Sequence, residues 1–73
     1  MTSADGPSPL NVVALLADVP AENLARGQVG TVVEVLSRGS VLVEFADDDG
    51  RPYAIAACPI NELLVLHYAR QAA

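Results

Sequence analysis

The sequence predicts an all-β fold: five short antiparallel strands, strongly bent into a small barrel, with a 3₁₀ turn before the last strand. Two observations support this prediction. Runs of β-branched and aliphatic residues alternate with Gly, Asp and Pro, which is typical of short strands joined by tight turns. The chain has 73 residues, and closure is favoured because an open sheet of this size leaves two edges free to aggregate.

The composition argues against several classes of protein. Nine acidic residues outnumber four basic ones, for a net charge of −5 at pH 7, whereas nucleic-acid binding requires a basic surface. One cysteine cannot form an internal disulfide, and a free thiol fits a reducing compartment. The N-terminus has no basic or apolar leader region, and no apolar run approaches roughly 18 residues. We therefore expect a cytoplasmic protein that does not interact with membranes.

The chain divides into three parts. Residues 1–9 are small, polar and proline-containing, and we expect a flexible N-terminal arm. Residues 10–67 carry the barrel, and residues 68–73 form a C-terminal tail. Within the barrel, an apolar stretch before Pro20 predicts a first strand of roughly six residues. The loop that follows it is expected to place Leu24 against the core.

The remaining strands are separated by turn residues. Two glycines mark the start of a β-branched run that ends at Leu36. Gly27 can supply a positive φ in a tight turn, and Gly30 leaves room for a close backbone approach or a bulge. Asp47-Asp48-Asp49-Gly50 predicts a hairpin. The later strands are expected at residues 41–45, 53–57 and 63–66, with the 3₁₀ turn between the last two.

The two hairpins predict a register. If Glu34 and Glu44 both face water as cross-strand neighbours, Val33 lies opposite Phe45 and Val35 opposite Val43. In the next hairpin Phe45 lies opposite Tyr53, Val43 opposite Ile55 and Val41 opposite Ala57. The interior is then formed by Val33, Val35, Val43, Phe45 and Ile55. The aliphatic residues predicted beside the two glutamates on the outer side are Val32, Leu36, Leu42, Ala54 and Ala56.

Three stretches of the chain carry a family resemblance. The segments RGQVGTVVEVL and VLVEFADDDGRPYA, followed by LLVL, resemble short uncharacterised bacterial proteins that form a domain-of-unknown-function family. That resemblance implies an SH3-like barrel and no established activity. The glycine-spaced part also looks like the KOW motif of ribosomal and transcription proteins, and like a stretch in the barrel of nitrile hydratase β subunits.

Few residues offer chemistry. Cys58 and His67 are the only cysteine and histidine; a catalytic pair needs a third, orienting group, and a zinc site needs three or four ligands. The adjacent acids Asp47, Asp48 and Asp49 lack the alternating spacing of an EF-hand loop. We expect no catalytic residues, no metal and no cofactor.

The expected function is a non-catalytic protein-interaction module. Its apolar outer face would be buried by a protein partner or a second copy, and its acids would select a positively charged partner. The expected partner-binding residues are Val32, Glu34, Leu36, Leu42, Glu44, Asp47, Asp48 and Asp49, with Gly27, Gly30 and Gly50 in structural roles. Three specific versions stay open: an antitoxin or immunity protein, an accessory barrel of a larger enzyme such as a nitrile-hydratase-like complex, and a KOW-like RNA-binding module.

Overall fold

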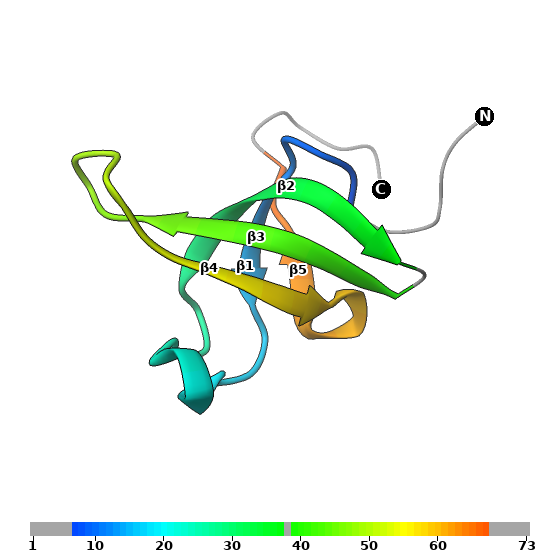
Figure 1. The fold of residues 1–73 in the computed structure, drawn as a ribbon, viewed down its shortest axis with the longest axis horizontal. Coiled ribbons are helices and arrows are strands. Elements are labelled where there is room, and N and C mark those ends of the chain that lie inside the picture. Colours follow the sequence, from blue (N-terminus) through cyan, green and yellow to red (C-terminus); the bar gives the residue numbers. More distant parts are fainter. Residues whose placement is uncertain (1–6, 38, 68–73) are drawn as a thin grey trace.

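The part of the chain that the structure describes forms five β-strands and two single-turn 3₁₀ helices (Figure 1). The computed structural model describes residues 7–37 and 39–67. Most of the predicted arm (residues 1–6) and the predicted tail (residues 68–73) lie outside the described residues. The all-β prediction and the 3₁₀ turn before the last strand are confirmed. The elements are β1 (Val12–Leu15), η1 (Pro20–Glu22), β2 (Val29–Ser37), β3 (Ser40–Ala46), β4 (Pro52–Pro59), η2 (Ile60–Glu62) and β5 (Leu63–Val65).

All five strands belong to one antiparallel sheet, in the order β4-β3-β2-β1-β5. β2 pairs with β1 through its first residues, 29–31, and with β3 from Gly30 to Ser37. Figure 1 shows β1 and β5 crossing behind β2, β3 and β4. The predicted closure is wrong: the sheet is open, with β4 and β5 at its edges. Among the described residues, β4 pairs with β3 alone and the three-residue β5 pairs with β1 alone, so the two edge strands do not meet.

The core lies where the two parts of the bent sheet face each other. Phe45 is its largest fully buried side chain. Leu24, in the loop after η1, is buried as predicted, and its backbone bridges to Val19. The buried hydrophobic residues are Val13, Leu15, Leu24, Val32, Val41, Val43, Phe45, Ala56, Cys58 and Leu63.

The predicted register between β2 and β3 is wrong. Glu34 lies opposite Leu42 rather than Glu44, and Val43 lies opposite Val32 rather than Val35. The ladder shifts between Val32 and Glu34, so Val33 is an extra residue in β2, and it shifts again before Ser37. A bulge interrupts the alternation of sides along a strand. Val32 is therefore fully buried, whereas Val33 is exposed.

The predicted register between β3 and β4 is correct only next to the turn. Ala46 lies opposite Pro52, as the prediction requires. A shift at Tyr53 then brings Ala54 opposite Phe45 and Ala56 opposite Val43. Small side chains consequently face the core. Tyr53, predicted opposite Phe45, and Ile55, predicted to be interior, are about half exposed at 50% and 52%.

Val35 is the third residue predicted to be interior that is exposed. It lies opposite the buried Val41, so its side chain points to the core side of the sheet. It is nevertheless 51% exposed, because it lies near the end of the β2–β3 hairpin, where the core is open. Of the five predicted interior residues, only Val43 and Phe45 are buried.

The three glycines that the sequence assigns to structural roles lie at two turns and at a close contact between strands. Gly27 and Gly50 have φ values of +92° and +82°, which favour glycine. Gly30 lies opposite Phe45. A Cβ atom at Gly30 would come within 2.6 Å of Val43 Cγ1 and 2.9 Å of the Glu44 carbonyl oxygen. Only a residue without a side chain fits there.

Candidate functional site on the outer face of the sheet

The side of the sheet turned away from the core is its outer face. Directly opposed residues of antiparallel strands point to the same side, so the pairing defines this face residue by residue. One row crosses four strands, from Val12 through Thr31 and Glu44 to Ile55. The outer face consists of Val12, Ala14, Val29, Thr31, Glu34, Leu42, Glu44, Ile55, Ala57 and Leu64.

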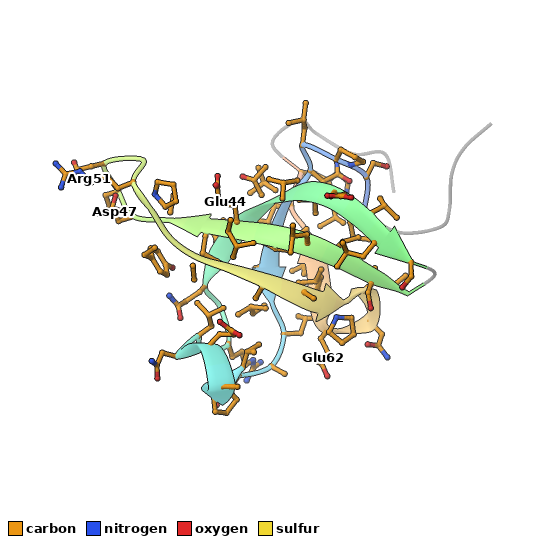
Figure 2. All side chains as sticks on the ribbon, in the orientation of Figure 1. Glu44, Asp47, Arg51 and Glu62 are labelled. Carbon is orange, nitrogen blue, oxygen red and sulfur yellow. The ribbon has the colours of Figure 1, made fainter. Side chains whose placement is uncertain are left out.

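Each of the two carboxylates on the outer face has an aliphatic cross-strand neighbour. Ile55 is 52% exposed, and its cross-strand neighbour Glu44 is half-buried. Figure 2 shows Glu44 projecting from β3, away from Glu62 on η2. In the next row, the exposed Glu34 lies opposite Leu42. The arrangement can bury apolar area while presenting negative charge at its centre.

The structure brings together only part of the predicted partner-binding set. Glu34, Leu42 and Glu44 share the outer face, and Leu36 is exposed near the end of β2. Val32 does not belong to this face, because the bulge turns it into the core. The two alanines predicted on the outer side, Ala54 and Ala56, also lie on the core side.

Sequence reasoning missed Ile55 as an outer-face residue. The alternation in Tyr53-Ala54-Ile55 is compatible with either side facing the core, and isoleucine is more often buried than alanine. The bulge at Tyr53 decides the question. There the Tyr53 ring lies 6.5 Å from the Phe45 ring, and its hydroxyl accepts a hydrogen bond from Gln28 Nε2 at 2.8 Å.

The predicted hairpin of residues 47–50 is confirmed. The backbone N–H groups of Asp49 and Arg51 donate to Asp47 Oδ1 at 2.9 and 3.0 Å, and the Gly50 N–H donates to the Asp47 carbonyl at 2.9 Å. The Asp47 carboxylate therefore caps the turn, which is the usual local role of Asp in this position. Figure 2 shows Asp47 and Arg51 together at this tip. Asp48 and Asp49 are exposed at the same place.

Cys58 and His67 lie in different surroundings. Cys58 is buried in β4, and its thiol donates to the Ala56 carbonyl at 3.7 Å. Burial raises the pKa of Cys58 above its ordinary value of 9.0, and the nearby Glu62 and Glu22 raise the pKa further. A thiol held protonated is a poor nucleophile. His67 is exposed, after β5.

The raised pKa of Cys58 predicts a loss of stability at alkaline pH. Below pH 9 the thiol is protonated in both states; above it, the unfolded chain releases the proton first, so the free energy of unfolding falls as pH rises. We expect the urea midpoint of the natural chain to fall more steeply between pH 8.5 and 10 than that of Cys58→Ala. Equal slopes for the two proteins would contradict the pKa assignment.

An open groove lies where the core reaches the surface. It has a volume of about 500 Å³. Its walls include the half-exposed Val35 and two serines. The groove is lined by Pro7, Val35, Ser37, Gly39, Ser40, Val41 and Ile60. These side chains supply no general base for a serine nucleophile, and such a base is needed for covalent catalysis.

Residues 7–37 and 39–67 contain no group of three or more His, Cys, Asp or Glu side chains placed to hold a metal ion. In the same part of the chain, no helix has the length and apolarity needed to cross a membrane.

The family model described as Domain of unknown function (DUF4926) matches residues 10–65. This range covers all five strands, and it confirms the part of the resemblance that pointed to a domain-of-unknown-function family. No curated protein and no solved structure matches the chain.

Proposed function

Since the chain belongs to the DUF4926 family, whose function is unknown, we propose its function from its own surface. It is a non-catalytic interaction module that binds a basic protein partner through the outer face. The observation that carries this proposal is the row in which Glu44 lies beside the half-exposed Ile55. Exposed aliphatic area supplies affinity when it is covered, and the carboxylates restrict which partners can cover it.

The charge balance supports a basic partner. The chain has nine acidic residues and four basic ones, so at least five acids have no cation of their own. Burying Glu34 or Glu44 under an apolar partner would leave a carboxylate unpaired, at a cost of several kcal/mol. A lysine or arginine above each carboxylate removes that cost. It also speeds association at low salt.

The strand order supports a finer fold assignment. Five short antiparallel strands in the order β4-β3-β2-β1-β5, with a 3₁₀ turn between the last two, are consistent with an SH3-like domain whose edges stay apart. We place it in the bacterial cytoplasm, where a free, buried Cys58 remains reduced.

The test compares two double variants, in each of which two acidic side chains are neutralised. The biotinylated full chain, the outer-face variant Glu34→Gln/Glu44→Gln and the control Asp18→Asn/Glu22→Gln are used to capture proteins from an extract of the native host. The control keeps an acceptor for the Arg26 N–H, which donates to Asp18 Oδ1 at 2.8 Å. Each captured protein is purified, and its affinity is measured at 50 and 300 mM salt.

We expect to capture a basic protein that binds the outer-face variant at least fivefold more weakly than it binds the natural chain. The same protein should bind the control variant as tightly as it binds the natural chain. Its affinity should fall with salt, because exposed charges are screened. Capture of no protein, or equal weakening by both variants, would contradict the proposed function.

A further inference from the structure

β4 is the long free edge of the sheet. It has eight residues, whereas the opposite edge strand, β5, has three. β3 is the one strand that pairs with β4 among the described residues, so the other side of β4 carries backbone N–H and C=O groups that no strand satisfies. An edge of this kind is a template for another strand. Pro52 and Pro59 end the usable stretch, because proline cannot donate a backbone hydrogen bond.

Acidic residues flank β4 at both ends. The exposed Asp48 and Asp49 lie in the turn just before it, and Glu62, labelled in Figure 2, lies in η2 just after it. The exposed Arg51 stands between these two aspartates and the first residue of β4, so that end keeps a net negative charge. In the middle of the strand, Ile55 lies beside Glu44 of β3 on the outer face. The free edge is therefore apolar at its centre and negatively charged at both ends.

This charge pattern disfavours a second copy at the same edge. If two β4 strands paired antiparallel, Asp48 and Asp49 of one copy would face Glu62 of the other. If they paired parallel, each acidic end would meet its own equivalent. Both arrangements oppose like charges, and each chain adds a net charge of −5.

We propose that β4 is a docking edge for an extended basic segment of a partner protein, which adds to the sheet as a sixth strand beside Tyr53–Cys58. This inference rests on the proposed function and specifies how the partner binds. Neighbouring strands are about 4.8 Å apart, so a side chain placed beside Ile55 is two strand spacings from Glu44. A lysine or arginine can span that distance by laying its aliphatic stem over Ile55.

The test uses the ¹⁵N-labelled full chain and three synthetic octapeptides with capped ends. The first alternates lysine and valine. The second replaces each lysine with glutamate. The third keeps the lysine-valine sequence but is N-methylated at every backbone nitrogen, so it retains its charge and side chains while losing all backbone donors. Amide chemical shifts and hydrogen exchange are followed in each titration, and binding of the first peptide to Glu44→Gln is measured as well.

We expect the lysine peptide to shift and protect amides within residues 53–58. N-methylation should weaken binding at least tenfold, the glutamate peptide should not bind, and Glu44→Gln should weaken binding of the lysine peptide about threefold. Equal binding of the N-methylated peptide would overturn strand addition but leave an outer-face partner in place. Failure of the lysine peptide to bind, or protection of β4 by self-association at high protein concentration, would also overturn it. Loss of the proposed function itself would appear separately, as no difference between the variants in the capture experiment.

Discussion

Replacing Val32 with aspartate should unfold the domain, whereas the same replacement at Val33 should leave it folded. Val32 is fully buried, and Val33 is 42% exposed. An aspartate at position 32 would place an unpaired charge in the core, which costs several kcal/mol. A single core in so small a domain contributes about 3–5 kcal/mol of net stability, so the substitution removes most or all of it. Circular dichroism during urea titration measures both variants.

Alanine at the same two positions gives a milder pair of variants. Their free energies of unfolding can be measured even when Val32→Asp does not fold. Val32→Ala should lower the free energy of unfolding by about 2 kcal/mol through lost burial and a cavity. Val33→Ala should change it by less than about 0.5 kcal/mol, as is usual for surface positions. The register predicted from the sequence requires the opposite order. If Val33→Ala lowered the free energy of unfolding more than Val32→Ala, the bulge in β2 would not lie at Val33.

Gly30→Ala should destabilise the domain by about 1–3 kcal/mol, and Gly30→Val should destabilise it further. The added Cβ atom would come within 2.6 Å of Val43 Cγ1 and 2.9 Å of Phe45 Cδ2. Both neighbours are fully buried and have little freedom to move, and overpacking a filled core has a cost of this order. Urea unfolding of the purified variants provides the measurement.

A double-mutant cycle with Val43→Ala separates the steric effect from other consequences of replacing glycine. Val43→Ala removes the methyl group that the new Cβ atom meets, so the double variant should be more stable than the sum of the two single effects implies. Additive effects, or a Gly30→Ala protein as stable as the natural chain, would show that the close approach at Gly30 is absent.

Local signals in the sequence were sufficient to predict the secondary structure. The strands of the meander, the Asp47–Gly50 hairpin, the positive φ at Gly27 and the burial of Leu24 all follow from nearby residues. Each depends on turn chemistry or on a short apolar run. The outward position of Glu34 and Glu44 was likewise predictable, because burying an unpaired carboxylate is costly.

The register was not predictable from local signals. Successive apolar residues, as at Val32-Val33, are compatible with either side facing the core, and a bulge at Val33 or Tyr53 has no distinctive local sequence. For the same reason, Ile55 was expected in the interior and instead lies on the outer face. The sequence therefore predicted the outward position of the two glutamates of the candidate site, Glu34 and Glu44. It missed Ile55, one of the main apolar residues of that site.

The sequence by itself determined the all-β class, the order of strands and turns, and the net charge of −5, since each follows from composition or neighbouring residues. The tertiary structure decided which apolar residues are buried and left the sheet open, with β4 as a free edge. These outcomes depend on packing against residues distant in the chain, such as Val13, Leu15 and Leu63. Small side chains on β4 face this core, and the bulges are the backbone adjustments that put them there.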